Sequence, residues 1–171
     1  GGDGAALARI LWTQGASVDV YLFGKVEETK GDARINFEIL RNISEAKTKN
    51  FHNHNLDFED DCQADSFHYT GMVADFVIDS FFGTGLTRKL EGEINELASH
   101  LSRYKDDLAY SQIFSIDVPS GLNSDSAIEI GENIKADLTV TFTAPKLANI
   151  FPPASDFNGV LVVANIGSPQ E

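Results

Sequence analysis

Cysteine is almost absent from this chain of 171 residues, in which Cys62 stands alone. A single thiol cannot form an internal disulfide, and this scarcity suits a reducing compartment. Cys62 also follows a run of acidic residues at positions 59–61, whose charges disfavour the reactive thiolate. We therefore expect a cytoplasmic protein in which this cysteine has no catalytic role.

Positive charge is also scarce, because 13 Lys and Arg residues face 26 Asp and Glu residues and give a net charge of −13. A nucleic-acid-binding protein needs a basic face for the phosphate backbone, and an anionic membrane would repel this chain. Neither partner is therefore expected. A small phosphorylated ligand remains possible, since phosphates also bind to backbone N–H groups.

Long apolar runs are missing, since no stretch approaches the ~20 residues of a membrane helix. The first residues carry no Met, basic segment or apolar segment of a signal peptide. They read Gly-Gly-Asp-Gly, which looks like the interior of a motif, so we expect further residues upstream. A hydrophobic fraction of 42% suits a globular protein. We expect residues 1–171 to form one domain, truncated at its N-terminus.

Apolar spacing predicts alternating helices and strands. Helices are expected over 5–14, 33–43 and 91–104, and strands over 18–23, 73–79, 113–118, 138–142 and 159–164. Ile35, Ile39, Leu40 and Ile43 should form the buried stripe of the second helix. Nearly all-apolar strands that alternate with helices are typical of a parallel sheet covered on both faces. The predicted fold is α/β, a Rossmann-like three-layer α/β/α sandwich with a mostly parallel sheet.

The loop that follows the strand 73–79 is the first candidate site, because ligands of open parallel sheets bind beyond the carboxyl ends of the strands. Asp79 leaves the strand, and Gly83 and Gly85 come shortly after it. Arg88 and Lys89 add positive charge behind them. We interpret the loop as an anion nest. The alternative is that the two glycines merely turn the chain.

The second candidate site follows the strand 113–118. Asp117 ends this apolar strand, where a carboxylate does not help packing unless something needs it. Pro119 stiffens the turn, and Gly121 lets the chain double back. The alternative is that Asp117 only accepts backbone N–H bonds within the turn.

Two further positions deserve consideration. Residues 1–4 open the first helix, where backbone N–H groups can approach an anionic ligand. The alternative there is a plain turn with Asp3 as the helix cap. Lys146 follows the strand 138–142 at the edge where it can reach a ligand. The motifs G-x-S-x-G and H-E-x-x-H and a P-loop lysine are all absent from the sequence.

Four motifs in one order carry a resemblance: G-G-D-G, V-I-D-x-x-x-G-T-G-L, I-D-V-P-S-G-L and A-D-L-T-V-T-F-x-x-P-K. From residue 1 to about residue 167 the chain resembles the NAD(P)H-hydrate epimerase family, also called the YjeF amino-terminal domain. The resemblance implies a Rossmann-like α/β/α fold. It also implies an isomerase that interconverts the S and R forms of hydrated NADH and NADPH, a repair of damaged cofactors.

The resemblance also implies roles for particular residues. It makes Asp79 and Ser120 ligands of a potassium ion and Asp117 the substrate-contacting carboxylate, our candidate acid/base. The implied substrate-binding residues are Gly1, Gly2, Asp3, Gly83, Thr84, Gly85, Leu86, Thr87, Arg88, Lys89 and Asp117. The family's G-x-G-N-N-G-G-D-G loop contributes two asparagines that this sequence lacks.

The ending V-A-N-I-G-S-P-Q-E is similar to the junction in two-domain members of the family. In those proteins an ADP- or ATP-dependent dehydratase domain follows, and we expect one here, together with a homo-oligomeric state. A non-catalytic dinucleotide sensor on the same fold is the alternative function. A nicotinamide-dependent oxidoreductase is disfavoured, because no complete G-x-G-x-x-G follows the first strand.

Overall fold

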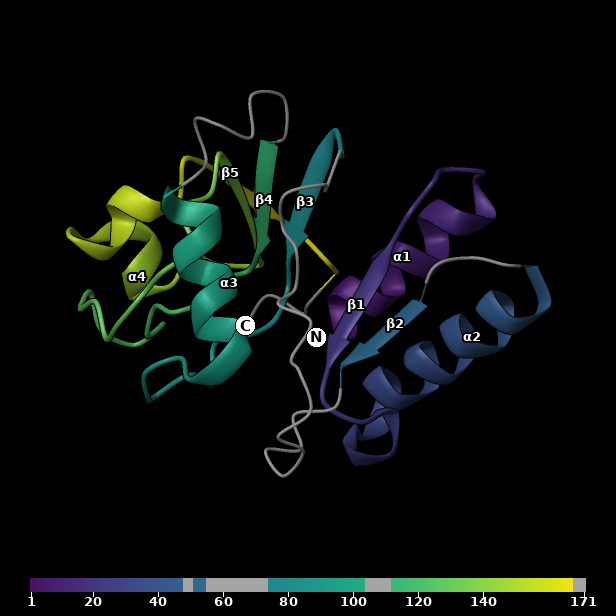
Figure 1. Ribbon diagram of the computed structural model, residues 1–171. Coiled ribbons are helices and arrows are strands. Elements are labelled where there is room, and N and C mark those ends of the chain that lie inside the picture. The colour runs from purple at the N-terminus through teal and green to yellow at the C-terminus, as the bar shows by residue number, and fades with distance from the viewer. Residues whose placement is uncertain (48–50, 55–73, 104–111, 168–171) are drawn as a thin grey trace. The chain divides into compact units, whose positions relative to one another are not determined.

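The structure is a computed structural model that describes residues 1–47, 51–54, 74–103 and 112–167 (Figure 1). The described residues fall into two compact units, which meet in the sequence between residues 54 and 74. Each unit is described by itself. No helix within the described ranges is long and apolar enough to cross a membrane. The single-domain organisation stays a prediction.

The first unit contains two helices, a short 3-10 helix and a two-stranded parallel sheet (Figure 1). Its elements are α1 (Gly2–Thr13), β1 (Val20–Phe23), η1 (Val26–Glu28), α2 (Gly31–Lys47) and β2 (Phe51–His54). β1 and β2 pair with Val20 opposite Phe51. Gly15, with φ 91°, follows α1 in the left-handed conformation that commonly ends a helix.

The core of the first unit lies between its helices and β1. Trp12 is 6% exposed and donates its indole N–H to the carbonyl of Val18 at 2.8 Å, so it serves packing. The prediction for α2 was wrong at Ile35, which is 54% exposed, whereas Phe37 and Leu40 are buried. Each residue advances about 100° round a helix, so Ile35 lies about 140° from Leu40 and away from the buried face.

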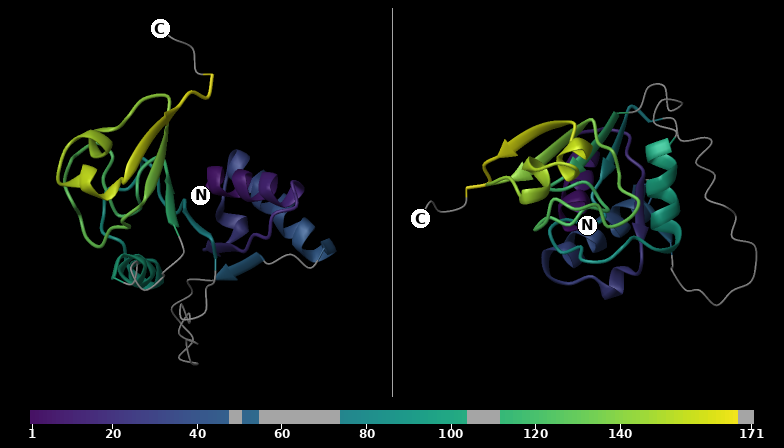
Figure 2. Two further views of the ribbon diagram at one scale, coloured as in Figure 1. Left: turned by 90° about the horizontal axis from the view of Figure 1, so that it is seen from above. Right: turned by 90° about the vertical axis from the view of Figure 1, so that its left-hand side faces the viewer.

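The second unit holds a four-stranded sheet in the order β3-β4-β5-β6, with every neighbouring pair parallel. Its elements are β3 (Phe76–Asp79), α3 (Gly92–Arg103), β4 (Gln112–Ile116), β5 (Leu138–Phe142), α4 (Leu147–Ile150), η2 (Ala154–Phe157) and β6 (Val160–Ala164). Figure 2 shows α3 and α4 alongside this sheet. The predicted α/β class with a parallel sheet is confirmed. α4 and the two 3-10 helices were missed because each is only one turn long.

Alternation along the strands decides which side chains are buried in the second unit. In β4 and β5 the buried residues are Ile113, Ser115, Thr139 and Thr141. Successive side chains of a strand point to opposite faces, so three hydroxyl groups share the buried face with one isoleucine. Because the strands are parallel, their carboxyl ends meet at one edge. Asp79 ends β3 at that edge, and Asp117 and Thr143 come directly after β4 and β5.

Candidate functional site

Asp79 is a carboxylate buried inside the second unit, with 1% of its surface exposed. Its Oδ1 accepts a hydrogen bond from the Ser120 hydroxyl at 2.6 Å. Its Oδ2 accepts two at 2.8 Å, from the Ser115 hydroxyl and from the Ser120 backbone N–H. The structure therefore brings together Asp79 and Ser120, which the family resemblance implies as ligands of one potassium ion, and adds Ser115.

Burial dominates the electrostatics of Asp79. It raises the pKa of this carboxyl, and the hydrogen bonds from Ser120 and Ser115 only partly offset the effect. Within the described part of the chain, no lysine or arginine forms an ion pair with Asp79. A buried carboxylate without a cationic partner is costly when ionised, so this position favours either a proton or a bound cation.

Asp117 stands in an unusual backbone conformation directly after β4. Its φ is 72°, and the Val118 N–H donates to the carbonyl of Ile116 at 3.0 Å, which makes a γ-turn centred on Asp117. The Asn149 side-chain amide donates to the Asp117 carbonyl at 3.3 Å. A non-glycine residue with positive φ is uncommon, and such strain clusters at functional sites.

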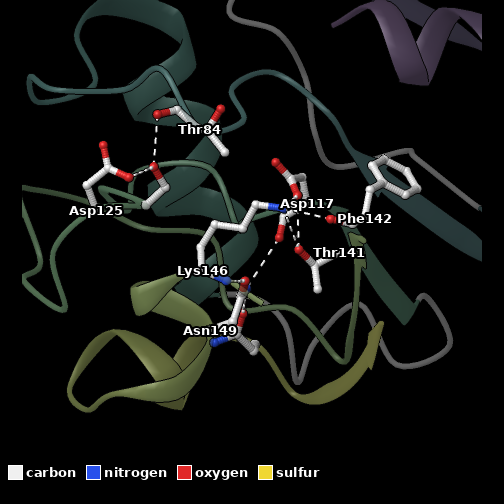
Figure 3. A network of polar contacts seen from close by, with 9 residues as sticks. Thr84, Asp117, Asp125, Thr141, Phe142, Lys146 and Asn149 are labelled. Carbon is white, nitrogen blue, oxygen red and sulfur yellow. Dashed lines mark hydrogen bonds and ion pairs between the residues drawn. The ribbon is translucent and has the colours of Figure 1, made fainter. Parts of the chain in front are cut away.

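The two carboxylate oxygens of Asp117 have different surroundings. Oδ1 accepts hydrogen bonds from the Thr141 hydroxyl at 2.9 Å and from the Lys146 ammonium group, as Figure 3 shows. Oδ2 lies 3.7 Å from the point where a Cβ at Gly83 would stand, and no described residue donates to it. The Asp117 side chain is 16% exposed, so the carboxylate combines one anchored oxygen with one available oxygen.

The loop of residues 83–89 lies next to Asp117 through Gly83. The Thr84 carbonyl accepts a hydrogen bond from the Ser124 hydroxyl at 2.9 Å (Figure 3). Leu86 is buried at 6% exposure. Thr87, Arg88 and Lys89 are exposed. Leu86 thus anchors a loop whose basic end faces solvent.

The predicted anion nest does not take the form that pairs right- and left-handed residues, because neither Gly83 nor Gly85 has a positive φ. A nest in a turn conformation, the other form, stays a prediction. No atom lies within 4 Å of a Cβ built at Gly85, and the single neighbour at Gly83 is at ordinary contact distance. Neither the conformation of the loop nor its own packing therefore requires these glycines.

Gly121, in contrast, is required by the fold. Its φ is 104°, and an added Cβ would stand 2.3 Å from the Glu132 carbonyl oxygen. The sequence prediction that this glycine lets the chain double back is confirmed. The close passage of residues 132–133 fixes Ser120, whose carbonyl accepts the Ile134 N–H at 2.9 Å.

The other predicted site residues belong to the first unit. Gly1 is the N-cap of α1, Gly2 packs against Ala33, and Asp3 lies in the first helical turn. The alternative that made Asp3 the helix cap is therefore wrong. The site described above is built from residues of the second unit only.

Sequence reasoning missed Ser115, Thr141 and Asn149. Thr141 carried a weak signal, because Thr139 and Thr141 alternate in β5 and so share one face of the strand. Ser115 carried none, since it is the single hydroxyl residue of β4. Asn149 carried none, since the one-turn helix α4 has no apolar period.

In the part of the chain that the structure describes, no cluster of three or more His, Cys, Asp or Glu residues forms a metal site.

Comparison with known proteins finds relatives that match nearly the whole chain. The family model described as YjeF-related protein N-terminus matches residues 1–148. The NAD(P)H-hydrate epimerase of Oenococcus oeni is 33% identical to this chain, and the match covers 98% of this chain and 69% of that protein. The NAD(P)H-hydrate epimerase of Roseobacter litoralis is 34% identical, and the match covers 98% of this chain and 72% of that protein. The bifunctional NAD(P)H-hydrate repair enzyme Nnr of Thermofilum pendens is 32% identical over 99% of the chain. The chain spans 30% of the length of that bifunctional relative.

Proposed function

Because this chain belongs to the family of YjeF-related N-terminal domains, we propose that it acts as an NAD(P)H-hydrate epimerase, which interconverts the S and R forms of hydrated NADH and NADPH. The observation that carries the proposal is Asp117: a strained residue at a strand end, with one carboxylate oxygen anchored and the other available. The names of the standalone relatives support the same activity.

The epimerisation needs one acid/base group that both donates and accepts a proton. C6 of the hydrated nicotinamide ring carries a hydroxyl and the ring nitrogen, which makes it a hemiaminal. Once an acid protonates the hydroxyl, the nitrogen lone pair expels water, and water then returns to either face. Asp117 Oδ2 is our candidate for this group, since Thr141 and Lys146 already occupy Oδ1.

The loop 83–89 is proposed to hold the rest of the dinucleotide. Open space over Gly85 supports close approach of a ligand to the backbone, and the exposed Arg88 and Lys89 supply charge for its phosphates. In the first unit, Gly1, Gly2 and Asp3 stay predicted substrate-binding residues, and the α1 N-terminus to which they belong offers backbone N–H groups to an anion.

Asp79 and Ser120 fit the potassium ion that the family resemblance implies. Their oxygens form an all-oxygen set of carboxylate and hydroxyl, the chemistry that a hard cation prefers, and Asp79 has no cationic partner among the described residues. We propose that these two residues hold the ion. A bound potassium ion would supply the positive charge that the buried carboxylate lacks.

Chromatography of the two epimers tests the proposed function. The complete natural protein that contains this chain should bring a pure S hydrate to the equilibrium mixture faster than the spontaneous reaction does. Binding of the hydrates without any acceleration would contradict the epimerase and favour the non-catalytic dinucleotide sensor.

Three broader predictions accompany this function. Bifunctional relatives support a fused ADP- or ATP-dependent dehydratase domain. Exposed valines of the outer strand β6, Val160, Val162 and Val163, support a homo-oligomer. A cytoplasmic location stays a prediction from the cysteine content.

A further inference from the structure

We propose that Lys146 is the positioning residue of the acid/base carboxylate: together with Thr141 it holds Asp117 Oδ1 and thereby presents Oδ2 to the substrate. This inference rests on the epimerase function proposed above. It assigns to Lys146 a role that acts through Asp117 and involves no contact with the substrate.

The contacts of the Lys146 ammonium group leave it no hydrogen for a ligand. The group has three N–H donors. One donates to Asp117 Oδ1, one to the Thr141 hydroxyl at 3.0 Å and one to the Phe142 carbonyl at 3.2 Å, as Figure 3 shows. Three acceptors for three donors make Lys146 a fixed part of the strand ends. A lysine that served the substrate directly would keep a donor free.

The backbone of Lys146 is held as firmly as its side chain. Its N–H donates to the Asn149 Oδ1 at 2.8 Å, and the Asn149 amide in turn donates to the Asp117 carbonyl. Asn149 is 5% exposed and also donates to Asn158 Oδ1 at 2.9 Å. Backbone and side chain of Lys146 therefore reach Asp117 by two separate routes, one to its carbonyl and one to its carboxylate.

The anchored Oδ1 sets the direction of Oδ2. The outer torsion of an aspartate side chain is broad and two-fold, so an unanchored carboxylate samples many orientations. Thr141 and Lys146 approach the same oxygen and restrict that rotation, which leaves Oδ2 directed at the Gly83 loop. Among the described residues, Asn133 Oδ1 is the only fully buried side-chain oxygen or nitrogen without a hydrogen-bond partner. Asp117 Oδ2 also lacks a donor, so it is not fully buried and is accessible to a ligand.

Kinetics of the complete natural protein test this role. Lys146→Met keeps the length of the side chain and removes its charge and donors. We expect kcat to fall about 10²-fold, the effect of a reacting group displaced by about 1 Å, with KM within about threefold of wild type. Lys146→Arg should recover part of kcat. Lys146→Ala should recover activity when propylammonium is added, because that ion replaces the missing part of the side chain.

A matched control and a second variant keep the test decisive. Lys30→Met removes the charge of an exposed lysine in the first unit and should retain wild-type kcat. Thr141→Val removes the other donor to Asp117 Oδ1 and should lower kcat about tenfold. This variant tests the inference independently if Lys146→Met does not fold. Wild-type kcat in a folded Lys146→Met or Thr141→Val variant would overturn the inference. The inference would also be overturned if folded Lys146 variants lost kcat and neither the arginine substitution nor added propylammonium restored it. An inactive wild type would instead overturn the proposed function, and this inference with it.

Discussion

Asp117 and Thr143 adopt the same rare conformation at the ends of two adjacent strands, with φ 72° and 65°. Each is the centre of a γ-turn, closed by an N–H to C=O bond of 3.0 Å at Asp117 and 2.8 Å at Thr143. Each also keeps its own N–H in the sheet, since Asp117 donates to Val140 and Thr143 to Ala164, both at 2.8 Å. The sheet ladder thus holds two strained residues, each costing about 1–3 kcal/mol, at the edge where Asp117 and Lys146 meet.

The backbone at Asp117 decides which substitution tests its chemistry. Asparagine tolerates positive φ better than other non-glycine residues and can still accept hydrogen bonds from Thr141 and Lys146. Asp117→Asn therefore keeps the fold but cannot move a proton. We expect epimerase activity to fall about 10²-fold or more, measured by chromatography of the epimers.

An unfolding curve of the Asp117→Asn variant serves as the control for this loss. A midpoint close to that of wild type would show that the lost activity is chemical in origin. Wild-type turnover in the folded variant would assign Asp117 to turn structure alone.

The hemiaminal route predicts the fate of the hydrogen on C6. That route breaks a bond between C6 and oxygen or nitrogen and leaves the C6–H bond intact. Epimerisation in heavy water should therefore yield product without deuterium at C6, as measured by mass spectrometry and NMR. Deuterium at C6 in the epimerised product would instead indicate a carbanion mechanism.

Two glycines should respond in opposite ways to an added methyl group. Gly85 has open space around its Cβ position and no positive φ, so Gly85→Ala should change the free energy of unfolding by no more than about 0.5 kcal/mol. The same methyl group would stand where we propose that substrate approaches the backbone, so KM should rise. Gly121→Ala should destabilise the fold by at least about 2 kcal/mol, because its φ is positive and its Cβ would meet Glu132.

Urea unfolding and epimerase kinetics of both alanine variants measure these effects. An unchanged KM in Gly85→Ala would remove this glycine from the proposed binding loop. An unchanged unfolding midpoint in Gly121→Ala would contradict the close approach of residue 132.

The sequence was sufficient to predict the strand ends at Asp79 and Asp117, because an acidic residue after an apolar run is conspicuous and parallel strands share one carboxyl edge. It was insufficient for Ser115 and Thr141. Hydroxyl residues are ordinary in strands, and only the tertiary fold shows that their buried face adjoins the two carboxylates. The position of Lys146 was visible, but its partners were not, since the one-turn helix α4 and the γ-turn at Thr143 have no periodic signal.

Asp79 predicts a dependence of stability on both pH and potassium. Burial raises the pKa of this carboxyl, so the folded protein binds the proton more tightly than the unfolded chain. The stability that Asp79 contributes is therefore fully present below its ordinary pKa of 3.8 and is lost as pH rises through the raised value. A potassium ion at Asp79 would offset this loss only where the carboxyl is ionised. At neutral pH, potassium at ten times its Kd should add about 1.4 kcal/mol of stability.

Thermal unfolding in potassium and in tetramethylammonium chloride of equal ionic strength measures that gain. For a chain of this size we expect a Tm higher by about 3–6 °C in potassium at neutral pH, and little difference near pH 4. Asp79→Asn should lose the potassium effect at every pH, because its neutral amide does not attract the ion. Since Asp79 is hydrogen-bonded to Ser115 and Ser120, the variant also needs its own baseline in tetramethylammonium. Equal stabilisation of wild type and Asp79→Asn by potassium would place the ion elsewhere in the protein.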